Sequence, residues 1–255
     1  MSKNEAEDKC TSFAVWTEKL SKVYGDGVTR VKALHEVSVG IDSGKFTAIM
    51  GPSGSGKSTL MHCLAGLDTA TAGSIYMGEQ NLAKLNDTQL TKLRRSQVGF
   101  VFQTFNLIPT LNAKENITLP LDIAGGRVDW EWFDKVVTTL ELGDRLLHKP
   151  SELSGGQQQR VACARALVSR PRVVFADEPS GNLDSVSGGE LLGFLKQSVT
   201  LYKQTVVMVT HDAVAAAYAD KVLFLQDGQI VSDMFYPTPE KILNKLAGLS
   251  VKAGE

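Results

Sequence analysis

Gly51-Pro52-Ser53-Gly54-Ser55-Gly56-Lys57-Ser58 is the stretch from which the fold of this 255-residue chain can be inferred. It matches the phosphate-loop pattern G-x-x-x-x-G-K-[ST] at every fixed position. That pattern requires a strand before it and a helix after it. Lys45–Met50 (KFTAIM) is short and apolar enough for a buried strand, and Thr59–Leu67 reads as the start of a helix. A Gly/Ser-rich turn is the alternative, but a turn requires neither the lysine nor the hydroxyl that follows it.

The chemistry of this loop assigns expected roles to its residues. Its glycines let backbone N–H groups point inward at a phosphate, and the helix N-terminus adds partial positive charge. We expect Lys57 to reach the β- and γ-phosphates of a nucleotide and the Ser58 hydroxyl to ligate Mg²⁺. Upstream, Tyr24 ends an expected strand, where it could stack on adenine or be an ordinary edge-strand aromatic. The nucleotide contacts expected here are Tyr24 and every residue from Gly51 to Thr59.

The composition is that of an ordinary globular protein, with 43% hydrophobic and 22% charged residues. The net charge of −1 lacks the positive excess that is typical of nucleic-acid-binding domains, so no nucleic-acid partner is expected. The first ten residues are polar and do not resemble a secretory signal, and no apolar run has the length of a membrane span. Three cysteines without C-x-x-C spacing favour reduced thiols over disulfides or a metal site.

Apolar runs and turn signals predict alternating strands and helices around the loop. Asn86–Ser96 is expected to be a helix, with Asn86-Asp87-Thr88 as candidates for its cap, and Asp227-Gly228 is a strong hairpin signal. Asn112–Leu147 is expected to be helical with a break at Gly125-Gly126, and Gln158–Val168 forms a further helix. The expected strands are Phe13–Tyr24, Val31–Ile41, Lys45–Met50, Ser74–Met77, Val98–Phe102, Val173–Ala176, Thr205–Val209, Val222–Gln226 and Gln229–Phe235.

Polar side chains follow three of these apolar strands, at the edge where α/β folds place ligands. Gln103 follows one strand and could face Mg²⁺ and the γ-phosphate, or be a surface glutamine. Asp177 and Glu178 follow another strand. There Asp177 can hold Mg²⁺ and Glu178 can activate a water, unless the two acids merely cap a helix. His211 follows the third and could contact the γ-phosphate, although a lone histidine is usually structural.

Leu153-Ser154-Gly155-Gly156-Gln157 offers a second anion-binding helix terminus. Ser154 is a good N-cap, and the glycines after it leave backbone amides uncovered. A plain capped helix explains the same residues when they are taken alone.

Taken together, these motifs resemble the nucleotide-binding subunit of an ATP-binding cassette (ABC) transporter from about Val15 to Phe235. LSGGQ at Leu153–Gln157 matches the family signature without a change. The extended strings FQTFNLIP, SGGQQQRVA and ADEPSGNLD are similar to the macrolide-export, lipoprotein-release and cell-division branch. Departures are small: Ser180 stands where threonine is commoner, and NAKEN replaces the usual TAxEN at Asn112–Asn116.

The resemblance implies an α/β fold, the P-loop NTPase fold of ABC ATPases, with a mixed sheet, an antiparallel β subdomain and an inserted helical subdomain. Residues 1–11 are expected to be a polar tail and residues 241–255 a C-terminal helix and tail. Residues 12–102 and 171–240 are expected to form the catalytic core with the antiparallel β subdomain, and residues 103–170 the helical subdomain.

The resemblance also implies ATP hydrolysis with Mg²⁺ by a head-to-tail homodimer. Each ATP would lie between the phosphate loop of one copy and Ser154, Gly155, Gly156, Gln157 and Asp184 of the other. Glu178, His211 and Gln103 would serve catalysis, and Ser58, Gln103 and Asp177 the metal. A separate permease would dock near Gln103–Asn116 and hold the chain on the cytoplasmic face of the membrane.

Two other classes of function remain open. A soluble ABC ATPase that serves repair, translation or cluster assembly usually has tandem cassettes or long coiled coils, and neither is evident here. A non-catalytic nucleotide-dependent scaffold is disfavoured because Lys57, Glu178 and His211 are all present. Membrane co-fractionation separates the first alternative from a transporter motor, and an ATPase assay excludes or establishes the second.

Overall fold

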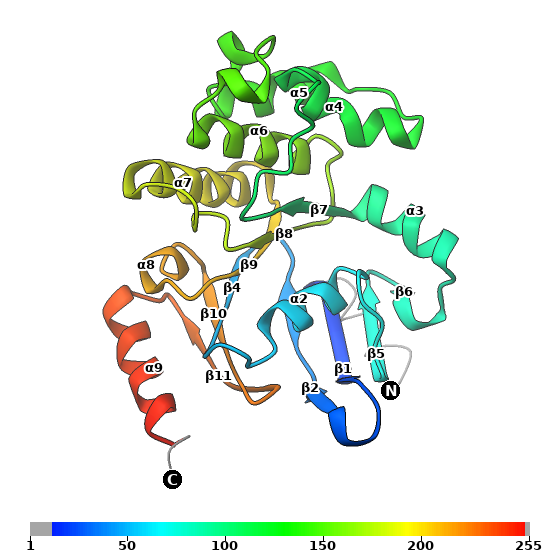
Figure 1. Cartoon of the computed structure of the whole chain (residues 1–255), viewed down its shortest axis with the longest axis vertical. Helices are drawn as coiled ribbons and strands as arrows, with labels where there is room; N and C mark the ends of the chain where they lie inside the picture. The colour runs from blue at the N-terminus through cyan, green and yellow to red at the C-terminus, as the bar shows by residue number, and fades with distance from the viewer. Residues whose placement is uncertain (1–11, 253–255) are drawn as a thin grey trace.

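The computed structural model describes residues 12–252 as two sheets and a set of helices, most of which lie around the larger sheet (Figure 1). The polar segment 1–11, with Cys10, lies outside the described residues. No described helix is long and apolar enough to cross a membrane.

The larger sheet has six strands in the order β11-β10-β4-β9-β8-β7. The five strands from β10 to β7 run parallel to one another, and β10 and β11 form an antiparallel hairpin at one edge. The hairpin turns at Asp227-Gly228, which confirms that prediction. The strands are β4 (Phe46–Met50), β7 (Val98–Val101), β8 (Val173–Asp177), β9 (Thr205–Val209), β10 (Lys221–Gln226) and β11 (Gln229–Phe235).

The smaller sheet is antiparallel and pairs β2, β1, β5 and β6 in that order, with β3 also on β1. The prediction of one strand over Val31–Ile41 is wrong, because this segment forms two strands. The Thr17 hydroxyl donates to Val37 O and accepts from Val39 N between them, so the segment shifts from one half of β1 to the other. The strands are β1 (Phe13–Tyr24), β2 (Val31–Val37), β3 (Gly40–Asp42), β5 (Ala72–Met77) and β6 (Gln80–Asn81).

Helices α4, α5 and α6 gather at one end of the molecule, and in the chain they lie between β7 and β8 (Figure 1). Of the three cap candidates, it is Asn86 that caps α3, and its side chain accepts from Gln89 N. The signature helix α6 begins at Gly155, three residues before its predicted start. The helices are α2 (Lys57–Leu64), α3 (Asp87–Gln97), α4 (Ala113–Ala124), α5 (Trp130–Thr139), α6 (Gly155–Leu167), α7 (Ser185–Tyr202), α8 (Ala213–Ala216) and α9 (Pro239–Lys252).

The five parallel strands of the large sheet are buried on both faces, which explains why they are almost continuously apolar. Val174 and Ala176 of β8 pack in a core shared with α5, α6 and α7. Val173 and Phe175 of the same strand point into a second core, shared with the small sheet and α2. Because α4–α6 share a core with the sheet, the division into a catalytic core and a helical subdomain stays a prediction.

The parallel register brings the carboxyl ends of β4, β8 and β9 to one edge of the sheet. Ile49 of β4 and Asp177 of β8 both pair with Val209 of β9. The segments that leave these strands are the phosphate loop, Glu178 and Thr210-His211. The fold therefore places three of the predicted functional segments side by side.

Candidate nucleotide site

The phosphate loop links the end of β4 to the first residue of α2, and two of its positions admit only glycine. A Cβ atom on Gly51 would lie 1.9 Å from Leu225 O. A Cβ on Gly56, whose φ is +99°, would lie 2.4 Å from Ala33 O. Close packing against β10 and β2 thus fixes the curl of the loop, which exposes the first amides of α2.

Lys57 folds back over the loop. Its ammonium donates to Gly51 O at 3.0 Å and to Pro52 O at 2.8 Å. Burial lowers the pKa of Lys57, while the nearby carboxylates of Glu178 and Asp177 raise it. The buried Ser55 Oγ has no hydrogen-bond partner among the described residues. A cation and an unpaired hydroxyl beside a helix N-terminus provide the positive charge and the hydrogen-bond donors that bind a phosphate.

A hollow of about 450 Å³ lies over this loop. It brings the phosphate loop together with the Asp177-Glu178 pair and His211. One wall comes from β2, which the sequence did not indicate. The described lining residues are Val31, Lys32, Ala33, Gly51, Ser53, Gly54, Gly56, Lys57, Ser58, Thr59, Asp177, Glu178, Val209 and His211.

Glu178 and His211 are directly connected in this hollow. The His211 backbone N–H donates to Glu178 Oε1 at 3.1 Å, and His211 Nδ1 lies 2.8 Å from the same oxygen. The buried Thr210 hydroxyl donates to Glu178 Oε2 at 3.3 Å. Glu178 itself has a φ of +45°, an uncommon conformation for a residue with a side chain. The carboxylate is therefore held at a fixed place by the end of β9.

The groups available for a metal are Ser58 and Asp177, which line the same hollow. Burial raises the pKa of Asp177, and so does Glu178; His62 and Lys57 oppose this shift. No group of three or more His, Cys, Asp or Glu suited to a metal occurs among the described residues. One hydroxyl and one carboxylate fit Mg²⁺, which usually takes few protein ligands and completes its shell with water and substrate phosphates.

Gln103 and Tyr24 are not among the described residues that line the hollow. Gln103 Nε2 donates to Asn182 Oδ1 at 3.3 Å, and Asn182 Nδ2 donates to Gln103 O at 3.0 Å. The Tyr24 hydroxyl donates to Asp68 Oδ2 at 2.5 Å, and the Lys22 ammonium lies 4.8 Å from the ring centroid. Asn182 and Asp68, which hold these two residues, could not be identified from sequence spacing.

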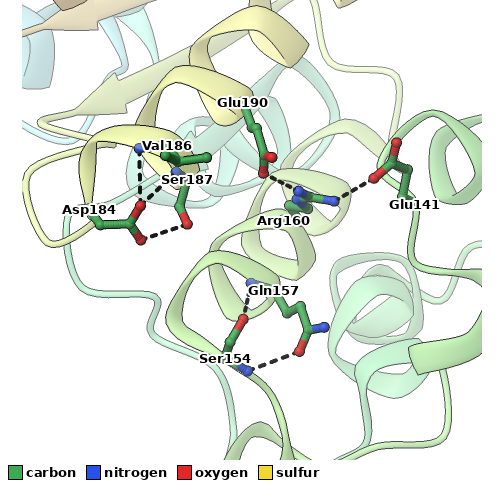
Figure 2. Close-up of polar contacts among 8 residues, drawn as sticks. All are labelled: Glu141, Ser154, Gln157, Arg160, Asp184, Val186, Ser187 and Glu190. Atoms are coloured by element: carbon green, nitrogen blue, oxygen red, sulfur yellow. Dashed lines mark hydrogen bonds and ion pairs between the residues drawn. The ribbon is translucent and has the colours of Figure 1, made fainter.

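Ser154 caps α6 as the sequence predicts, within a reciprocal pair of hydrogen bonds (Figure 2). Gln157 N donates to Ser154 Oγ at 3.3 Å, and Ser154 N donates to Gln157 Oε1 at 2.9 Å. Gly155 and Gly156 form the first turn of the helix. None of the described residues lining the phosphate-loop hollow comes from Ser154–Gln157.

Asp184 caps α7, next to the start of α6 (Figure 2). Its carboxylate accepts from Val186 N and Ser187 N, each at 3.0 Å, and from Ser187 Oγ at 2.8 Å. Hydrogen bonds from the backbone and hydroxyl of Ser187 are the main causes that lower the pKa of Asp184. Asp184 is also absent from the described lining of the hollow.

The two described cysteines, Cys63 and Cys163, are buried free thiols, as the sequence predicts. Burial raises the pKa of each to about 12. The thiols are therefore protonated at neutral pH and serve packing rather than chemistry.

The fold and this site define an ATP-binding cassette. The sequence model of the family described as "ABC transporter" matches residues 34–181, and the chain belongs to that family. It is an ABC-type ATPase domain, and its relatives include members of the macrolide-export and lipoprotein-release branch.

Several curated relatives are 41% to 45% identical to the chain over the residues that align. The lipoprotein-releasing system ATP-binding protein LolD of Legionella pneumophila is 45% identical over 218 residues, 84% of this chain and 95% of the relative. An ABC transporter ATP-binding protein of Methanocaldococcus jannaschii, MJ1508, is 45% identical over 212 residues, 82% of this chain and 94% of the relative. The macrolide export ATP-binding/permease protein MacB of Brucella melitensis is 45% identical over 218 residues, 85% of this chain. The chain spans about a third of the length of the MacB relatives, 34% in this case.

Solved cassettes have the same fold. The dimeric post-hydrolysis structure of the cassette MJ0796, bound to ADP and phosphate, superposes with a TM-score of 0.77 at 40% identity, covering 87% of this chain and 98% of that one. CbiO1 of Clostridium perfringens, part of the transporter complex CbiONQ, superposes with a TM-score of 0.79 at 25% identity, covering 95% of each chain. These likenesses confirm the α/β cassette fold expected from the sequence.

Proposed function

We propose that two copies of this chain pack head to tail around two ATP molecules and hydrolyse them to drive a separate membrane permease. One observation carries this proposal: the chain has two helix N-termini suited to anions, at Lys57 and at Ser154. Among the described residues that line the hollow, Asp177 and Glu178 are joined by the first of these termini and not by the second. The second is then explained as the half of the site that each copy offers to its partner. The dimeric MJ0796 cassette, bound to ADP and phosphate, supports this arrangement.

In this mechanism Lys57 holds the β- and γ-phosphates and Ser55 donates its free hydroxyl to the same anion. Ser58 and Asp177, with Gln103 once it approaches, would hold Mg²⁺, which supplies neutralising charge to the phosphate oxygens. Glu178 accepts a proton from the attacking water. Its position depends on the hydrogen bonds from Thr210 and His211. Asp184 and Ser154 contact the partner's nucleotide from their helix termini.

The permease would dock beside Gln103–Asn116, in a mainly apolar hollow of about 420 Å³ between α3, β7 and α6. Phe100, Phe102 and Pro120 offer apolar surface, and Arg94, Arg95 and Arg165 favour an apolar segment with an acidic residue. Arg165 also donates to Asn106 O at 2.6 Å and to Phe105 O at 3.0 Å. A permease segment bound here would thus contact both the loop after Gln103 and helix α6. The chain would then lie at the cytoplasmic face of the membrane, as a peripheral subunit.

Two measurements test this function. Steady-state ATPase activity should rise more than linearly with chain concentration, because the active species is a dimer. Affinity purification from detergent-solubilised native membranes should recover an integral membrane protein with the chain. Activity strictly proportional to concentration would contradict the shared site. A chain found only in the soluble fraction, without a membrane partner, would favour a soluble ABC ATPase instead.

A further inference from the structure

Arg160 joins three parts of the chain around the signature helix (Figure 2). It lies on α6, and its side chain is 23% exposed. One guanidinium nitrogen donates to Glu141 Oε2, after the end of α5, at 2.9 Å. Another donates to Glu190 Oε2 on α7. Arg160 and Glu190 are each the sixth residue of their helix, so the contact lies about 9 Å along each axis from the caps.

The first turns of α6 and α7 are also in close contact. A Cβ atom on Gly156 would lie 3.1 Å from Ser187 Oγ and 3.2 Å from Ser187 Cβ. The same Ser187 hydroxyl donates to the Asp184 carboxylate. The start of α6 therefore packs directly on the cap of α7, and Arg160 ties the two helices together one turn further along.

We propose that Arg160 is a positioning residue that fixes α6 and α7 to each other, so that Ser154 and Asp184 meet the partner subunit's nucleotide as one rigid unit. This rests on the proposed shared site. Arg160 does not line the phosphate-loop hollow of its own chain. Its loss therefore impairs the half of the site that the chain lends to its partner and leaves the chain's own phosphate loop intact.

The guanidinium is suited to this task because its planar fork donates in two directions at once. Glu141 and Glu190 lie on different elements, so one side chain must reach both. A lysine ammonium is a point charge and cannot keep two carboxylates in fixed planar geometry. The two acids are half or more exposed, so the network acts through alignment more than through binding energy.

The first test is subunit complementation with the full-length chain. Arg160→Met alone should lower ATPase activity by about fivefold to tenfold. Its affinity for ATP by calorimetry should stay within about twofold of wild type. Mixed with Lys57→Ala, it should recover activity above the mean of the two variants, since one site per mixed dimer is then intact. Mixed with Ser154→Arg, it should recover none, because both sites then carry a defective α6.

The control is Arg145→Met, which removes another arginine–carboxylate pair of the helical region, with Asp144 at 3.4 Å. It should keep wild-type activity. The two mixtures distinguish an error in the shared-site model from an error in the role of Arg160. If Lys57→Ala with Ser154→Arg does not recover, the shared site itself is wrong. If that mixture recovers but Arg160→Met does not recover with Lys57→Ala, only the positioning role is overturned.

The two acids give a second test, in which the single variants Glu190→Ala and Glu141→Ala leave Arg160 itself unchanged. Glu190→Ala breaks the link to α7 and should show the same complementation pattern as Arg160→Met. Combining the two changes should cost little more than either alone, because they remove one contact. Glu141→Ala leaves the α6–α7 link and should have a smaller effect. Equal effects of Glu141→Ala and Glu190→Ala, or full additivity, would overturn the proposal.

Discussion

Lys57→Ala should weaken ATP binding without unfolding the chain. Among the described residues, the Lys57 ammonium donates only to two backbone carbonyls, Gly51 O and Pro52 O. Burial lowers its pKa, while the neighbouring carboxylates of Glu178 and Asp177 oppose this shift and favour the cationic form. The ammonium is therefore available to a phosphate.

The size of the effect follows from the kind of contact that is lost. A charge-assisted hydrogen bond contributes about 1.5–3 kcal/mol. That corresponds to a roughly tenfold to hundredfold loss of affinity. The cost to stability should be about 1 kcal/mol or less, because the two freed carbonyls lie at an open hollow and can be hydrated.

Calorimetric titration with ATP measures the first quantity, and urea denaturation measures the second. Lys57→Met keeps most of the side-chain length without the charge, and it should lose as much affinity as Lys57→Ala. Lys92→Ala, at an exposed position of α3, is the control and should bind ATP normally. Unchanged affinity in Lys57→Ala, with a folded protein, would refute the assignment of the phosphate loop.

Three further changes test other parts of the site. Glu178→Gln should retain ATP binding and slow phosphate release by about 10²-fold or more, the scale of a lost general base; undiminished turnover would remove it from that role. Burial raises the pKa of Asp177 above its ordinary 3.8, so the folded state keeps a proton that the unfolded state loses, and stability falls as pH rises through that interval. Asp177→Asn should therefore flatten the urea stability profile as pH rises above the ordinary aspartate pKa of 3.8, while abolishing hydrolysis, and an unchanged profile would contradict this. Gly51→Ala should lower the free energy of unfolding by about 2–4 kcal/mol, because its Cβ meets Leu225 O, whereas Gly248→Ala, with open space around it, should not destabilise the fold.

The sequence was informative where local chemistry dictates local structure. The phosphate loop, the Asn86 and Ser154 caps and the Asp227-Gly228 hairpin all lie where the patterns predict. Continuous apolar runs such as Val173–Ala176 identified strands that are buried on both faces. Parallel strands end at one edge, so the proximity of Glu178 and His211 also followed from the sequence.

The rest depends on contacts between distant segments. The break in Val31–Ile41 arises from the register of β1, which hydrophobic alternation does not encode. Gly155 and Gly156 are helical despite their low propensity, because the cap and the packing on Ser187 compensate. Other contacts likewise join residues that belong to no common motif. They are the packing of Ala33 beside the phosphate loop, the Tyr24–Asp68 hydrogen bond and the Arg160 network.

ATP hydrolysis by a mixture of Lys57→Ala and Ser154→Arg tests the shared-site account most directly. Each variant alone has a defect in both sites of its dimer, one in the phosphate loop and the other at the start of α6. In a mixed dimer both defects fall in one site, and the other site is wild type. The account predicts activity in the mixture well above that of either variant. No recovery, with both variants folded and mixed dimers formed in ATP, would contradict it.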